Sequence, residues 1–305
     1  MNITNSKKYA MGIAALLILI FHIWIPVFRY GTNLGQIERF IIGASYIGVD
    51  IFFFVSAYVL TLRPINNIEA YGKFLLNRIA KMVPLFIVAY LTGQFLWFIP
   101  ALLTTYILFT PIFKVSKKSP GISFFLLLLC WAAITTILLE YINESQNLGI
   151  YLFRIPIILL GSYLASFDGK MSKGLKLSLG VLLTIIGIYI TINYGYMNKL
   201  DVPYKDTFYL TGIPLTIGVL LLIDSASEYI QILPLKFLGN ISLELYFTQV
   251  VFGTFFVETF YGILNNKVLT NFATIAISIL ISAMLGFLWK LLSKKQESIK
   301  QKRAQ

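Results

Sequence analysis

The apolar runs of this chain constrain its fold more than any other feature. They are roughly 17–25 residues long, the length that a helix needs to cross a bilayer, and they do not alternate between apolar and polar positions as half-buried strands do. Only helical bundles and closed barrels satisfy the backbone hydrogen bonds in lipid. The lack of alternation therefore predicts an all-α, polytopic bundle of transmembrane helices in a single domain, 1–305.

The composition supports this class and excludes others. Charged residues make up 12% of the chain and hydrophobic residues 58%, whereas about 25% of a soluble domain is charged. The net charge of +12 could indicate a nucleic-acid partner. We expect none, because the basic residues lie in short loops between apolar runs, where membrane topology explains them. One cysteine, Cys130, and one histidine, His22, are too few ligands for a zinc site, so no metal is expected.

Ten spans are expected along the chain. They cover 9–29, 41–62, 79–94, 95–113, 121–139, 149–167, 174–194, 208–223, 237–259 and 268–292. Residues 79–113 are interrupted only at Gly93 and Gln94, so they could form two spans or one broken helix. With ten spans, most Lys and Arg residues fall on the side of the two termini, which the positive-inside rule assigns to the cytoplasm. This side includes a basic loop, 63–78, and a basic tail from about residue 293. The protein is therefore expected to be a multi-pass protein of the cell membrane.

Four ionisable side chains fall within the predicted spans, and they are His22, Asp50, Arg154 and Glu244. From the rise of a helix, the first three and Gln249 lie about 16–22 Å from the cytoplasmic face, and Glu244 lies lower, at about 10 Å. Such groups often mark functional sites in membranes, although they also hold helices together. His22 is suited to proton transfer near neutral pH. Asp50 could fix its tautomer, and Arg154 could hold a carboxylate or stabilise an oxyanion.

Six segments, in order along almost the whole chain, carry a resemblance to a known family. They are GIAALLILIFH at 12–22, GVDIFFFVSAY at 48–58, FLLNRIAKMVPLF at 74–86, LWFIPALLTTYILFTPIF at 96–113, RIPIILLGSYLA at 154–165 and LGNISLELYFTQ at 238–249. This ordered set resembles the acyltransferase-3 family of bacterial integral-membrane acyltransferases.

The resemblance implies an enzyme that moves an acyl group, usually acetyl, from cytoplasmic acetyl-CoA. The implied acceptor is a hydroxyl of a cell-surface polysaccharide, such as a capsule, or of its lipid-linked precursor. His22 matches the family histidine and would be the catalytic base or acyl relay. Two positions depart from the family pattern: Met11 stands where the family usually has arginine, and Gln249 stands where it commonly has histidine. Lys8, one turn before Met11, could substitute for that arginine.

The phosphates of the donor are expected to meet the basic inner surface of the bundle. Beside Lys8, the candidates are Arg63, Lys73, Arg78 and Lys81. The positive-inside rule by itself also explains basic residues at these positions. The alternative function is an exporter or translocator of a polysaccharide or lipid-linked sugar on the same bundle, in which the polar layer lines a path instead of a reaction centre.

Overall fold

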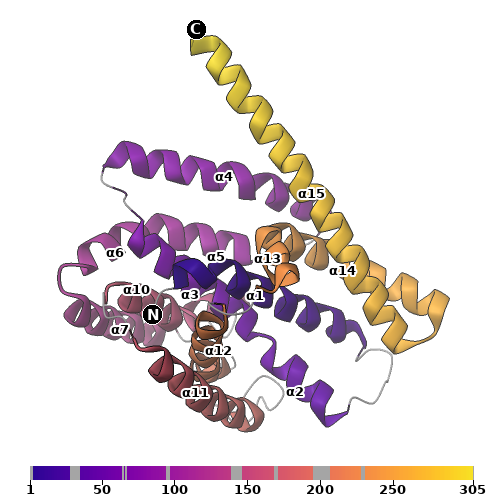
Figure 1. Cartoon of the computed structure of the whole chain (residues 1–305), viewed down its shortest axis with the longest axis horizontal. Coiled ribbons are helices and arrows are strands. Elements are labelled where there is room, and N and C mark those ends of the chain that lie inside the picture. Colours follow the sequence, from indigo (N-terminus) through magenta and orange to yellow (C-terminus); the bar gives the residue numbers. More distant parts are fainter. Residues whose placement is uncertain are drawn as a thin grey trace.

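The computed structural model describes residues 3–27, 35–63, 65, 67–93, 97–138, 146–167, 171–194, 207–227 and 231–304. These residues form a bundle of helices without strands (Figure 1). Ten helical segments within the described ranges are long and apolar enough to cross a membrane. The prediction of an all-α, multi-pass membrane protein is therefore confirmed.

The bounds of the helices follow the chain in order. They are α1 (Ile3–Val27), α2 (Gln36–Ala44), α3 (Ile47–Leu62), α4 (Ile68–Leu91), α5 (Phe98–Thr104), the π-helical turn η2 (Thr105–Phe109), α6 (Thr110–Ser116), α7 (Pro120–Ile137), α9 (Gln146–Leu152), α10 (Ile155–Ala165), α11 (Lys173–Tyr194), the 3-10 helix η4 (Thr207–Gly212), α12 (Ile213–Ala226), α13 (Leu233–Asn240), α14 (Ser242–Leu264) and α15 (Lys267–Ala304).

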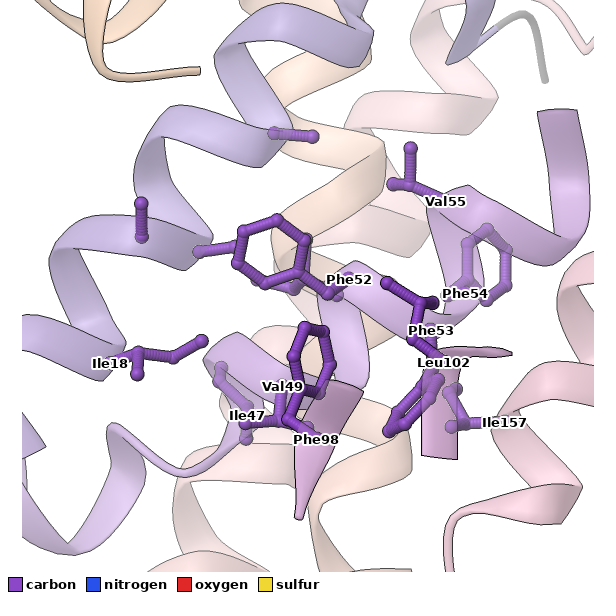
Figure 2. Close-up of a cluster of buried hydrophobic side chains, with 14 of the residues drawn as sticks. Ile18, Ile47, Val49, Phe52, Phe53, Phe54, Val55, Phe98, Leu102 and Ile157 are labelled. Atoms are coloured by element: carbon purple, nitrogen blue, oxygen red, sulfur yellow. The ribbon is translucent and has the colours of Figure 1, made fainter. Parts of the chain in front are cut away.

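Helix α3 is the central element of the bundle. Nearly all of its side chains are buried, because α1 packs along one side of it and α10 along another. The backbones approach closely at Gly48, where a Cβ would come within 2.7 Å of the Ala14 carbonyl oxygen. Figure 2 shows Phe52 and Phe53 of α3 beside Phe98 of α5, and the ring centroids of these pairs are 5.8 and 5.3 Å apart. The aromatic core thus extends from α3 to α5.

Helix α1 is held on its other side by α13 and α14. At the crossing of α1 and α13, Gly12 faces the backbone of Leu235 and Gly239 faces the carbonyl group of Lys8, with no room for a Cβ at either glycine. Small residues let membrane helices approach closely in this way, so that van der Waals packing stabilises the contact. These contacts fix the rotation of α1 and hence the direction in which its polar side chains point.

The outer helices present apolar side chains to the surroundings. Thr135 is the one described side chain of α7 that is buried, and α4, α11 and α15 also carry many exposed large apolar residues. Lipid is the solvent that suits such surfaces. Figure 1 shows α4 along one border of the bundle and α15 extending past it, and α15 continues through the basic tail as far as Ala304.

The predicted basic loop 63–78 is wrong, because the chain is helical again from Ile68. The helix starts there because the Asn67 side chain accepts a hydrogen bond from the backbone N–H of Ala70 at 2.8 Å. Helix α4 ends at Leu91 and α5 begins at Phe98, so the region between the second and fifth predicted spans contains two helical spans.

The predicted span 237–259 is also wrong as one continuous helix. It is broken at Ile241, which separates the short helix α13 from α14. The membrane-spanning segment starts at Ser242. The break lies among Gly239, Asn240 and Ser242, and it lets α13 lie against α1 while α14 takes its own direction across the bundle.

Candidate active site

His22 lies near the end of α1 and is partly buried. Its ring packs edge-on against Phe21 and Tyr246, with ring centroids 5.6 and 6.4 Å away. Nδ1 lies 2.8 Å from the Ile18 carbonyl oxygen. Since a carbonyl oxygen only accepts hydrogen bonds, Nδ1 is the nitrogen that carries the proton in the neutral ring. Nε2 then keeps its lone pair and can take up a proton.

Asp50 and Arg154 form a buried ion pair. Arg154 Nε lies 2.9 Å from Asp50 Oδ1, and the two side chains are 2% and 1% exposed. Arg154 occupies the break between α9 and α10, and Pro156 lies in the first turn of the new helix. Its Nη1 donates a hydrogen bond to the Ile150 carbonyl oxygen at 3.0 Å, and its guanidinium lies 3.7 Å from the ring centroid of Tyr209. Arg154 therefore holds a carboxylate, which is one of the two roles expected for it.

The structure separates the predicted polar layer into distinct groups. Among the described residues, no hydrogen bond, ion pair or ring contact joins His22 to Asp50, Arg154 or Gln249. The carbonyl group of Ile18, and not the carboxylate of Asp50, fixes the histidine tautomer. Gln249 is 2% exposed on α14, on the same helix as the tyrosine that contacts the histidine. The layer is thus a histidine site and an ion-pair site on neighbouring helices.

Two adjoining cavities lie between α1, α3, α4 and η2. Their volumes are about 150 Å³ and about 110 Å³. Both are lined by Met11, Ser56, Arg78 and Tyr106. Met11 and Arg78 therefore line the same two cavities. The position at which the resembled family usually has arginine lies in a cavity that is already basic.

Three of the predicted donor-binding residues line these cavities, whereas Lys8 and Lys73 line neither. Arg78 and Lys81 line the larger of the two, and Arg63 and Arg78 line the smaller. The guanidinium groups of Arg63, which follows α3, and of Arg78 on α4 lie 4.7 and 5.4 Å from the ring centroid of Phe74, which brings the two cations to the same aromatic ring. Lys81 Nζ lies 3.0 Å from Glu244 Oε1, so this pair joins α4 to α14.

Lys7 is a cavity residue that the sequence did not single out. It is partly buried and lines the smaller cavity, whereas the side chain of Lys8 is exposed and lines neither cavity. Lys7 precedes Met11 by four residues and Lys8 precedes it by three, and both spacings place side chains on one helical face. Helical spacing alone cannot choose between them, and the choice follows from the rotation of α1.

Tyr246 is a second residue that the sequence left unassigned. It lines the larger cavity and also packs against the ring of His22. Its own ring centroid is 4.9 Å from that of Phe98, which lines the same cavity. The Tyr246 side chain therefore separates the basic cavity from the His22 ring. The sequence feature that could have pointed to Tyr246 is its position inside the segment LGNISLELYFTQ, which carries part of the family resemblance.

The chemistry that this arrangement allows is proton transfer at His22 beside a cavity suited to an anion. Within the described part of the chain, no three His, Cys, Asp or Glu side chains lie close enough to hold a metal ion. The cations that line the two cavities can contact the phosphates of a ligand. A group carried into the larger cavity would reach Tyr246, directly next to the histidine ring.

A protein-family model, the acyltransferase-3 model described as an acyltransferase domain, matches residues 9–96 and 91–289. The two matched segments cover nearly the whole chain and include every residue described above for the histidine site, the ion pair and the shared cavity lining. Comparison with curated proteins and with solved structures gives no match.

Proposed function

The chain belongs to the acyltransferase-3 family, and we propose that it is a membrane-bound O-acyltransferase that takes acetyl from cytoplasmic acetyl-CoA. The acceptor in this proposal is a hydroxyl of a cell-surface polysaccharide or of its lipid-linked precursor. The termini and the basic cavities then face the cytoplasm, in agreement with the distribution of Lys and Arg. Membership of the family supports acyl transfer, and the donor and acceptor are our inference.

The observation that carries the proposal is the contact of His22 with Tyr246, a residue that lines the basic cavity. Its Nδ1 is engaged by Ile18, which leaves Nε2 as the base. Tyr246, against the other side of the ring, lines the cavity that Arg78 and Lys81 share. An acyl donor with phosphates held by these cations would have its acyl end near the histidine.

In the proposed reaction, Nε2 of His22 takes the proton of the acceptor hydroxyl as its oxygen attacks the thioester carbonyl carbon. The carbon–sulfur bond breaks, the new ester leaves with the acetyl group, and the CoA thiolate recovers the proton from the imidazolium. The Ile18 carbonyl group holds the ring orientation throughout, because the protonated Nδ1 donates to it in both states.

Asp50 and Arg154 are assigned a positioning role in this proposal. Their ion pair joins α3 to the break before α10 and leaves the guanidinium over Tyr209. Because α3 also packs against α1, the ion pair helps to fix the position of α1 and therefore of His22. Among the lysines before Met11, we assign donor contact to Lys7, since it lines the cavity with Arg78.

The central test replaces His22 with alanine. His22→Ala is expected to abolish acetylation of surface polysaccharide while the protein still inserts into the membrane, since an apolar residue is easily accommodated in a span. Ile20→Ala, at a partly buried position of the same helix that makes no ring contact with His22, is the matched control and should retain activity. Mass analysis of the polysaccharide measures the acetyl group per repeat. Full activity of His22→Ala would refute the proposal.

The same measurement separates acyl transfer from export. Cells that lack the protein should keep the surface polymer and lose its acetyl groups. Loss of the polymer with unchanged acetylation of what remains would favour the exporter instead. In that case, the histidine and the cavities would line a path for the sugar.

A further inference from the structure

A third cavity, of about 610 Å³, opens beside the two described above. It lies between the end of α3, the start of α4, and α6. The charged residues that line it are Arg63, Lys114 and Lys117. Its other lining residues include the apolar side chains of Ile65 and Ile68. The cavity therefore combines cations with an apolar wall, and no Asp or Glu is among its lining residues.

The three cavities lie in a row, and neighbouring cavities share lining residues. The large cavity shares Leu60 and Arg63 with the 110 Å³ cavity, which in turn shares Met11 and Arg78 with the 150 Å³ cavity that ends at Tyr246. Along α3, the row runs from Arg63 to Phe52, eleven residues or about 16 Å. A row of this length suits an extended ligand, with one end among lysines and the other beside the histidine ring.

The wall of the large cavity is fixed where α4 meets η2. The Tyr71 hydroxyl donates a hydrogen bond to the Ile107 carbonyl oxygen at 2.7 Å. This carbonyl lies within a π-helical turn, where the usual helical pattern is interrupted. Tyr71 lines the cavity together with Lys114 and Lys117 of the helical segment that follows the turn. The hydrogen bond thus ties the two sides of the cavity together.

We propose that the large cavity binds the nucleotide end of the acyl donor. Arg63, Lys114 and Lys117 contact its phosphates, and the base lies against Ile65 and Ile68. The pantetheine arm then passes Met11 and Arg78 and places the acyl group at Tyr246. This assignment rests on the proposed function, since it takes the donor to be a CoA thioester. It adds Lys114 and Lys117 to the residues that contact the donor, and it assigns them to the phosphates of the nucleotide.

A matched pair of lysines distinguishes this site from the general basic surface. Both lysines are exposed, but Lys117 lines the cavity and Lys118 does not. Lys117→Gln and Lys118→Gln remove the same charge from adjacent positions. The positive-inside rule makes no distinction between them. Nucleotide binding in the cavity predicts that only Lys117→Gln weakens donor affinity.

The experiment uses the full-length protein in lipid nanodiscs and three probes: CoA, adenosine 3′,5′-bisphosphate and pantetheine. Loss of one charged hydrogen bond predicts about a tenfold rise in Kd for CoA and for the bisphosphate in Lys117→Gln. Lys114→Gln should act in the same direction. Affinity for pantetheine should be unchanged in both variants, and Lys118→Gln should match the unaltered protein with all three probes.

Equal weakening by Lys117→Gln and Lys118→Gln would overturn the assignment, as would unchanged CoA affinity in Lys117→Gln. Failure of the proposed function has a different signature. If CoA and the bisphosphate bind as expected but polysaccharide acetylation does not depend on His22, the nucleotide site stands and the reaction is wrong. If acetylation depends on His22 but both lysine variants bind CoA normally, the nucleotide site alone is wrong.

Discussion

Removing one partner of the Asp50–Arg154 pair is expected to destabilise the protein strongly. Both side chains are almost fully buried, at 1% and 2% exposure. Breaking such a pair leaves a charge in a poorly solvated interior, and the typical cost is about 3–5 kcal/mol. Arg154→Met and Asp50→Leu should therefore each lower the free energy of unfolding by an amount in this range. The two variants are not expected to be equal.

The difference between the two variants follows from the contacts and the charge of the group that stays behind. Without Asp50, the Arg154 guanidinium keeps its hydrogen bond to Ile150 and its place over the Tyr209 ring. Without Arg154, the Asp50 oxygens have no other hydrogen-bond partner among the described residues. A cation over an aromatic ring is stabilised by about 1–2 kcal/mol when desolvated. Asp50→Leu should nevertheless be the more damaging change, because an unpaired carboxyl group can take up a proton and become neutral, whereas the guanidinium stays charged.

The double variant tests the reasoning most sharply. Asp50→Leu/Arg154→Met removes both charges at once, and replacing a buried pair with apolar residues is often neutral. It should be more stable than either single variant. Thermal and denaturant unfolding of the purified proteins in one detergent, followed by tryptophan fluorescence, supplies the comparison. A double variant whose loss equals the sum of the single losses would refute the coupling, because independent sites behave additively.

Two further predictions use matched pairs of residues. Lys7→Gln is expected to raise KM for acetyl-CoA several-fold with little change in kcat, since Lys7 lines the basic cavity, while Lys8→Gln should leave both constants unchanged in a membrane assay with labelled donor. Gly239→Ala should destabilise the protein by about 1–3 kcal/mol, because its Cβ would overlap the carbonyl group of Lys8. Gly253→Ala, where the added Cβ meets open space, should instead stabilise α14 by about 0.5–1 kcal/mol in unfolding experiments.

The boundaries of the helices show where sequence reasoning succeeds and where it stops. The apolar runs mark ten spans because the length needed to cross lipid is a local property of the chain. The start of α4 at Ile68 was missed, since basic residues on a helix that begins before the membrane look like a loop. The break at Ile241 was missed because it serves the contact of α13 with α1, which is distant in sequence.

The amino-acid sequence by itself determined the class of protein and the positions of its ionisable membrane residues, His22 among them. Residue type and apolar run length are sufficient for these conclusions. The tertiary structure decided which groups meet: Asp50 with Arg154, His22 with Ile18 and Tyr246, and Lys7, not Lys8, with the cavity. The physical reason is that each of these contacts depends on the rotation and depth of a helix, which distant close-packing contacts set.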